Sequence, residues 1–324
     1  MVIEDQVLSG QERLGFLLRS LYASHGFERY RMSKFEEYDL YSRNRDFLLS
    51  SAVITFTDPT GRLMALKPDV TLSIVKNRRD TPGQLQKLYY HENVYRVSSA
   101  EEGFREQTQV GVECMGEVDD SCIAETLRLA AESLHLCSEH FILEISHLDL
   151  LNAFVDALAP GRASKEAILA CAGAKNLHGI TDICRESGLA SGAEQPLLDL
   201  LSLYGVPRTV MPRVRSLAAA FGAEEMAERL GRAVAGFTGT ELENRVQIDF
   251  SAVSDLRYYN GIAFRGFIDG VPDSVLSGGQ YDALMRRMSR RDRAIGFAVF
   301  LDRLSGWSGL TQDQPSGKEE SVRA

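Results

Sequence analysis

The spacing of apolar residues in the first half of the chain predicts a helix followed by extended segments. Leucines recur every three or four positions between Gln11 and His25, as on one face of an amphipathic helix, and Gly26 is a typical C-terminal stop. Runs rich in β-branched and aromatic residues then alternate with turn signals. The predicted elements are a helix over 11–25, a hairpin over 52–66, a short helix over 71–77, long antiparallel strands over 86–96 and 104–116, and a helix over 120–138.

The second half opens with a different pattern, rich in Ala and Leu at helical spacing, which extends from residue 148 to 240. β character returns in segments 246–250 and 257–268, and the pair Gly278-Gly279 predicts a tight turn into a further helix. Together these patterns predict an α+β fold in which an antiparallel sheet is flanked by helices. Its predicted parts are a core at 1–147 and 241–310, a helical insertion at 148–240, and a polar tail at 311–324 that is expected to be disordered.

Composition excludes several classes of function. The chain has 324 residues, with 36 Lys and Arg against 45 Asp and Glu, so its formal net charge is −9 and charge alone would not bring it to nucleic acid or an anionic membrane. The first residues, MVIEDQVLSG, lack the apolar stretch of a secretory signal, and no window is apolar enough to span a bilayer. We therefore expect a cytoplasmic protein with no membrane partner.

The cysteines and histidines give no sign of a disulfide framework or a metal site. The five cysteines are an odd number without C-x-x-C spacing, and the six histidines form no H-E-x-x-H motif or i, i+4 pair. We expect reduced thiols, most of them in the core, and neither a metal nor a cofactor.

The segment 104–116 carries the clearest chemical pattern. If it is a strand, Thr108, Val110, Val112 and Cys114 lie on one apolar face, and the other face presents carboxamides and a carboxylate around a glycine. A glycine inside a strand often marks the close approach of a ligand. Taken alone, the pattern equally suits a solvated face of an edge strand. The residues of the polar face are Gln107, Gln109, Gly111 and Glu113.

Two further groups of polar residues have both a functional and a structural interpretation. Asp69 and Thr71 precede an apolar helix, where they could hold an ammonium group or simply cap the helix. The pair Tyr258-Tyr259 could line a site or belong to the core. The basic run 286–293 could contact phosphate or an acidic partner, although such runs are usually solvated helix ends.

Five segments in this order resemble the catalytic core of histidyl-tRNA synthetase, a class II aminoacyl-tRNA synthetase. The resemblance runs from the first helix to Leu304 and includes the helical insertion. It implies the class II synthetase fold. The segments are LKPDVT (66–71), YRVSS with FREQTQVGVECMG (95–116), DLRYYNGIAF (255–264), SGGQYDALM (277–285) and IGFAVFLDRL (295–304).

The departures from this family lie on the ATP side of the site. Ser98 stands where the family has a glutamate that reads adenine, and Gly103 matches an arginine that grips ATP phosphate. Ser254 replaces an arginine that promotes attack on ATP, and Phe300 takes the place of a glycine that leaves room for the nucleotide. Losing one charge donor from such a site costs about 10²–10³ in rate, so we expect no adenylation. Synthetases of this family continue into an anticodon-binding domain, which we expect to be absent here, and hence no tRNA partner.

The amino-acid side keeps the family's residues. Asp69 and Thr71 match the pair that holds the substrate's α-amino group, with the carboxylate shortened by one carbon. Gln109 and Glu113 match the residues that meet the carboxylate side and the imidazole, and Tyr259 matches the tyrosine at the other ring nitrogen. The histidine-binding set that the resemblance implies is Asp69, Thr71, Arg96, Gln109, Glu113, Tyr258, Tyr259 and Tyr281.

A retained amino-acid pocket with a degraded ATP site is similar to the regulatory subunits of ATP phosphoribosyltransferase. That resemblance implies a non-catalytic chain that supports a short-form catalytic subunit and confers feedback inhibition by L-histidine, in a hetero-octamer built on a synthetase-like dimer. Met32-Ser33 stands where the dimer-forming motif usually has a proline. Two alternatives remain open, a truncated synthetase-like enzyme that activates an amino acid and a free-standing histidine sensor.

Overall fold

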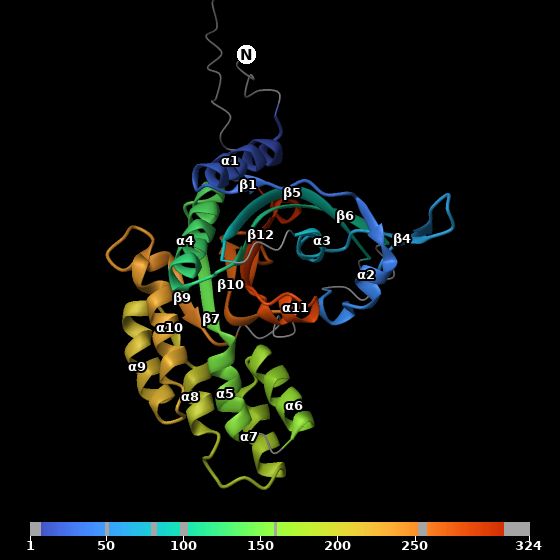
Figure 1. The fold of residues 1–324 in the computed structure, drawn as a ribbon. Coiled ribbons are helices and arrows are strands. Elements are labelled where there is room, and N and C mark those ends of the chain that lie inside the picture. Colours follow the sequence, from blue (N-terminus) through green and yellow to red (C-terminus); the bar gives the residue numbers. More distant parts are fainter. Residues whose placement is uncertain are drawn as a thin grey trace, which may run out of the picture.

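A nine-stranded sheet forms the centre of the molecule (Figure 1). The computed structural model describes residues 8–48, 52–78, 83–97, 103–158, 161–251 and 258–307. In order across the sheet, the strands are β1 (Glu28–Arg29), β5 (Gln86–Val97), β6 (Phe104–Gly116), β12 (Arg293–Phe300), β11 (Leu276–Gln280), β10 (Asn260–Ile268), β7 (Phe141–His147), β9 (Val246–Asp249) and β8 (Tyr204–Gly205).

The predicted antiparallel pairing holds for most of the sheet, which also contains two parallel pairs. Strand β1 pairs with β5 in parallel, and β7 pairs with β9 in parallel, while the remaining pairs are antiparallel. The parallel pair β7–β9 follows from the helical segment between them, because a parallel connection needs a long crossover. The predicted α+β class, a sheet flanked by helices, is confirmed.

Helices α1 (Gly10–Ser24) and α4 (Asp120–Cys137) cover one face of the sheet. Ser9 and Glu12 form a capping box at the start of α1, which fixes its first turn. The helix buries Leu14 and Leu18 as its period predicts, whereas Leu17 is exposed. These helices pack on the apolar face of β6, so the predicted alternation along that strand is confirmed.

The opposite face carries a second core. It is built by α3 (Thr71–Asn77), α2 (Tyr38–Ser42), α11 (Asp282–Arg287) and the turn η2 (Arg45–Phe47). Beside them lies a small antiparallel sheet of β2 (Phe35–Glu37), β4 (Leu63–Leu66) and β3 (Thr55–Thr57), which contains the predicted hairpin. Side chains that join this core from separate elements include Tyr41, Leu72, Leu88, Met115 and Leu284.

Between β7 and β9 the chain forms a group of helices beside the end of the sheet (Figure 1). Strand β8 lies within this segment and pairs with β9, a strand that the helical pattern did not predict. The division into core and insertion at 148 and 240 stays a prediction. The elements are α5 (Leu148–Leu158), α6 (Arg162–Gly173), α7 (Leu177–Glu186), α8 (Gln195–Leu201), α9 (Pro207–Ala219), α10 (Glu224–Val234), η3 (Ala235–Phe237) and η4 (Glu243–Arg245).

The prediction of a turn at Gly278-Gly279 is wrong, because both glycines lie inside β11. A Cβ atom on Gly278 would lie 2.4 Å from Cβ of Phe297 and 2.6 Å from the carbonyl oxygen of Gly296, so glycine is needed for close strand packing. Helix α11 starts after this strand, and the short turn η5 (Leu301–Leu304) follows β12.

The basic run 286–293 makes internal contacts as well as facing solvent. Arg287 donates to the carbonyl of Arg43, and Arg290 donates to the carbonyls of Val75 and Lys76 at the end of α3. These arginines therefore cap the C-terminal ends of two helices, which is a structural role. The tail 311–324 lies outside the described residues. None of the described helices is long and apolar enough to cross a membrane, and the five cysteines are free thiols.

Candidate functional site

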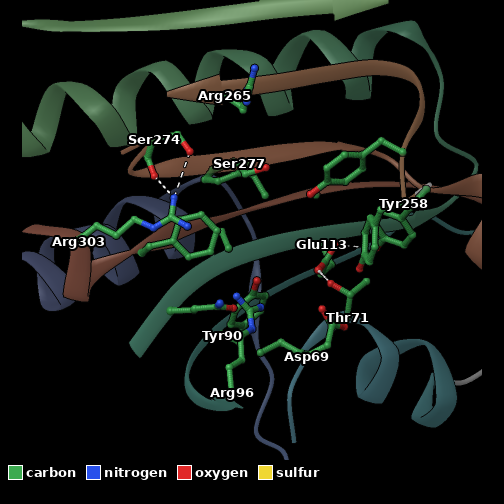
Figure 2. Close-up of a pocket in the computed structure, with 18 residues that line it drawn as sticks. Asp69, Thr71, Tyr90, Arg96, Glu113, Tyr258, Arg265, Ser274, Ser277 and Arg303 are labelled. Atoms are coloured by element: carbon green, nitrogen blue, oxygen red, sulfur yellow. Dashed lines mark hydrogen bonds between the residues drawn. The ribbon is translucent and has the colours of Figure 1, made fainter. Parts of the chain in front are cut away.

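A cavity of about 190 Å³ lies between the sheet and α3 (Figure 2). Because one water needs only ~10–15 Å³, this space can receive a small organic molecule. The structure brings all eight residues of the predicted histidine-binding set to its lining, although they come from distant parts of the chain. They are Asp69, Thr71, Arg96, Gln109, Glu113, Tyr258, Tyr259 and Tyr281.

Strand β6 forms the floor of the cavity. Gln109 and Glu113 are only 4 % and 2 % exposed, so the interpretation of this face as a solvated edge is wrong. On this face Glu113 meets a glycine on the neighbouring strand, since Gly296 of β12 lies directly opposite it. A Cβ atom on Gly296 would lie 1.9 Å from Oε2 of Glu113 and 2.5 Å from the carbonyl oxygen of Val112. Glycine at 296 therefore makes room for the Glu113 carboxyl.

The mid-strand glycine of β6 has a similar role. A Cβ atom on Gly111 would lie 2.5 Å from the hydroxyl of Tyr90, which is on the adjacent strand β5. Gly111 thus makes room for a side chain of the protein itself, that of Tyr90. Tyr90 lines the cavity, and the sequence patterns did not single it out. The alternation along β5 would have placed it on the same face, because Tyr90 pairs with Gly111.

Glu113 is held by two hydroxyl groups. The Thr71 hydroxyl donates to Oε1 at 2.7 Å, and the Tyr281 hydroxyl donates to Oε2 at 2.6 Å. Burial raises the pKa of the Glu113 carboxyl to about 8, even though both hydroxyl donors favour the charged form, and the nearby Asp69 adds to the rise. Glu113 therefore holds its proton near neutral pH.

Asp69 contacts the start of α3 and also lines the cavity. Its Oδ1 accepts a hydrogen bond of 2.9 Å from the backbone N–H of Leu72 and so caps α3. It also lines the cavity, where burial raises its pKa although Leu72 and Arg96 oppose the rise. Arg96 is itself held in place, because it donates to the carbonyl of Pro68 at 3.1 Å and to the Gln107 side chain at 3.3 Å.

Tyrosines form the aromatic walls. The rings of Tyr258 and Tyr259 meet edge to face with centroids 4.8 Å apart, and Tyr258 lies 6.2 Å from Tyr281. Burial raises the pKa values of Tyr90, Tyr258 and Tyr281 well above the ordinary tyrosine value, so their hydroxyls stay neutral. Such walls accept a flat ring and leave hydroxyl groups at its edge.

The amide of Gln109 has an unused donor. Its Nε2 is buried and has no hydrogen-bond partner among the described residues. A buried amide N–H without a partner costs about 1–3 kcal/mol, so this atom is suited to an acceptor on a bound molecule. Gln109, Arg96 and Asp69 thus contribute donors and an acceptor to the lining of one cavity.

The far side of the cavity is arranged differently, and we call it the arginine end, defined by Arg265 and Arg303. The Arg303 guanidinium lies 4.3 Å from the centroid of the buried Phe300 ring. It also donates to the Ser274 hydroxyl at 3.1 Å and to the Ser274 carbonyl. Figure 2 shows Arg303 with Ser274 on one side and Glu113 with Thr71 on the other. Phe300 therefore fills space beside the arginine.

The structure describes only some of the other positions that the resemblance assigns to a degenerate ATP site. Gly103 has φ of +70°, a left-handed conformation that favours glycine, and a Cβ atom added there would meet no atom within 4 Å. It lies outside the cavity lining. Ser98 and Ser254 fall outside the described residues. No cluster of three or more His, Cys, Asp or Glu that could hold a metal occurs in the described ranges.

Comparison with known proteins places this geometry in a family. The histidyl-tRNA synthetase family model matches residues 8–304. A curated protein of Oceanobacillus iheyensis, named ATP phosphoribosyltransferase regulatory subunit, is 24 % identical over 290 residues, which is 89 % of this chain and 71 % of that protein.

Two solved structures share the fold. An ATP phosphoribosyltransferase regulatory subunit/histidyl-tRNA synthetase from Bacillus halodurans has a TM-score of 0.80 at 22 % identity, covering 91 % of this chain and 78 % of that one. A chain of the ATP phosphoribosyl transferase (HisG:HisZ) complex from Thermotoga maritima has a TM-score of 0.68 at 20 % identity, covering 93 % and 98 %. The chain belongs to the histidyl-tRNA synthetase family.

Proposed function

We propose that this chain is a regulatory subunit of ATP phosphoribosyltransferase, without catalytic activity of its own, and that it acts in the cytoplasm. The name of the curated relative supports the regulatory role. We further propose that its cavity binds L-histidine and that its partner is a short-form catalytic subunit, in a hetero-octamer built on a synthetase-like dimer. Neither tRNA nor a membrane has a part in this function.

The observation that carries the proposal is the pairing of complementary groups around one cavity. Asp69 and Thr71 suit the α-ammonium group, because a carboxylate and a hydroxyl can both accept from it. The unpartnered Nε2 of Gln109, together with Arg96, suits the α-carboxylate. Glu113 among the tyrosines suits an imidazole ring.

The arginine end supports the absence of amino-acid activation. In the family this side receives ATP, whereas here Phe300 occupies space beside Arg303, and Ser274 engages that arginine. Transition-state charge must be met by donors that are already aimed at it. We therefore expect no histidine-dependent exchange of pyrophosphate into ATP. Robust exchange would instead favour the synthetase-like enzyme.

Feedback inhibition requires coupling between the histidine site and the catalytic partner. Such coupling is typically about 1–3 kcal/mol, and it is reciprocal, so that histidine changes the affinity for the partner by the same factor as the partner changes the affinity for histidine. Regulation by this chain should therefore be visible in binding alone, before activity is measured.

Co-purification tests the proposal. The tagged full chain is mixed with a short-form catalytic subunit, with and without L-histidine, and the mass of the complex is measured. We expect a stable complex in which histidine changes the partner affinity. A chain that binds histidine but never the partner would favour the free-standing sensor.

Calorimetry tests the ligand separately. L-Histidine should bind the wild-type chain, and Glu113→Ala should abolish binding because it removes the group that faces the ring. Unchanged binding in that variant would show that the assignment of Glu113 is wrong. Tyr89→Phe is a matched control, since Tyr89 precedes Tyr90 on β5 and is absent from the cavity lining.

A further inference from the structure

One end of the cavity contains acidic groups, and none of the described residues places a cation in contact with Glu113. The titratable groups that face Glu113 are Asp69 before α3, Tyr90 on β5, Tyr258 before β10 and Tyr281 before α11. Glu113 forms no ion pair with any described Lys, Arg or His. The charge of Arg96 instead interacts with Asp69 and opposes the rise of its pKa. This acidic end, defined by Asp69 and Glu113, is therefore suited to positive charge that arrives with the ligand.

The surroundings of Glu113 are prepared for a carboxylate. The hydroxyls of Thr71 and Tyr281 reach separate oxygens of this group at 2.7 and 2.6 Å. Neutral hydroxyls stabilise an anion by donating to it without neutralising its charge. Gly296 leaves only enough room for the carboxyl, so the group is fixed in its position. With the cavity empty, burial keeps the proton on Glu113.

We propose that Glu113 passes its proton to the ring of the bound amino acid, so that the site selects an amino acid whose side-chain ring is a base. The inference rests on the proposed histidine-binding role of this cavity. It adds a selection by ring basicity to the selection by shape.

The step is a simple proton transfer. The O–H bond of the Glu113 carboxyl breaks, and an N–H bond forms on the unprotonated ring nitrogen, which uses its own lone pair. The products are a carboxylate that keeps Thr71 and Tyr281 as donors and a cationic ring that pairs with it. No proton is exchanged with solvent at a pH at which the free ring is neutral and Glu113 is protonated.

Calorimetry with an isosteric ligand tests the proposal. The full chain and Glu113→Gln are each titrated at pH 7.5 with L-histidine and with L-1,2,4-triazole-3-alanine, whose ring has nearly the same shape but is a much weaker base. The wild-type chain should bind the triazole at least about tenfold more weakly, since each pKa unit of lost basicity is worth up to a factor of ten. In Glu113→Gln the two ligands should bind within about threefold of each other, because a carboxamide has no such proton to give.

The pH dependence of the wild-type chain provides a test that needs no variant. Affinity for L-histidine should stay level from about pH 6.5, above which the free ring is neutral, up to the pKa of Glu113, about 8, and fall above it. If Glu113 were already ionised in the empty cavity, affinity would fall once the free ring loses its proton, above about pH 6.5.

Equal wild-type affinities for the two ligands, or a preference that persists undiminished in Glu113→Gln, would overturn the proton transfer and leave the histidine site standing. Binding of neither ligand would overturn the proposed function as well.

Discussion

At the scale of single residues, burial of Glu113 makes the stability of the ligand-free protein depend on pH. Its pKa is raised from an ordinary 4.5 to about 8, chiefly by burial. Between these two values the folded chain holds a proton that the unfolded chain releases. The free energy of unfolding should therefore decrease as the pH rises from about 4.5 to 8, at a rate of at most ~1.4 kcal/mol per pH unit from this group.

Glu113→Gln tests this linkage. The variant cannot ionise at this position, so its stability should depend less on pH than that of the wild type, and it should gain relative to the wild type toward pH 8. Urea unfolding of the two ligand-free proteins at pH 5, 6, 7 and 8 measures the difference. Parallel pH profiles would mean that Glu113 titrates normally in the folded chain.

Gly296 offers a steric test of the same group. Gly296→Ala places a Cβ atom against both the Glu113 carboxyl and the Val112 carbonyl, so we expect a loss of about 1–3 kcal/mol in stability and weaker histidine binding. Gly236→Ala is the matched control, because nothing lies within 4 Å of its Cβ position and its effect should stay within ~0.5 kcal/mol. Thermal unfolding and calorimetry check both variants. If Gly296→Ala were as stable as Gly236→Ala and bound histidine as well, position 296 would not be crowded by the Glu113 carboxyl.

At the scale of elements, the sequence predicted the type and bounds of a helix or strand well where one of its faces is apolar. Helix α3 runs from Thr71 to Asn77 as predicted, and β6 spans Phe104–Gly116 as predicted. The resemblance to a family grouped eight residues that the structure places around one cavity. No local pattern could have grouped them, because they come from segments up to 212 positions apart, from Asp69 to Tyr281.

The errors have a common physical cause: the residue type of a glycine or a tyrosine does not show which distant residues pack against it. The pair Gly278-Gly279 has the composition of a turn, yet it lies in β11, where Phe297 and Tyr259 leave no room for a Cβ atom. Tyr90 has the composition of an ordinary strand residue, and only its partner Gly111 on the next strand shows that it reaches the cavity. Both facts depend on contacts across strands.

Arg290 connects two elements that carry site residues. It follows α11, which starts beside Tyr281, and it caps the end of α3, which starts at Thr71. Arg290→Ala should cost about 1 kcal/mol and speed amide hydrogen exchange in α3, because two carbonyls lose their donor. Arg286→Ala is the control on the exposed side of the same basic run. Equal exchange in the two variants would show that this cap does not hold α3.

At the scale of the whole molecule, the cavity is built from the sheet, α3 and the segments beside them, and residues 148–240 contribute none of its lining among the described residues. The helical group lies beside β7 and β9, at the other end of the sheet from β5 (Figure 1). One cavity thus combines an acidic end suited to an amino acid with an arginine end where Phe300 fills space. We infer a chain that senses an amino acid and transmits its presence to a partner.

The most direct test of this account is the rate of a short-form ATP phosphoribosyltransferase, measured alone and with this chain, with and without L-histidine. We predict that the chain increases the rate, that histidine inhibits only when the chain is present, and that Glu113→Ala abolishes the inhibition while leaving the stimulation intact. Equal inhibition by histidine with and without the chain would contradict the account.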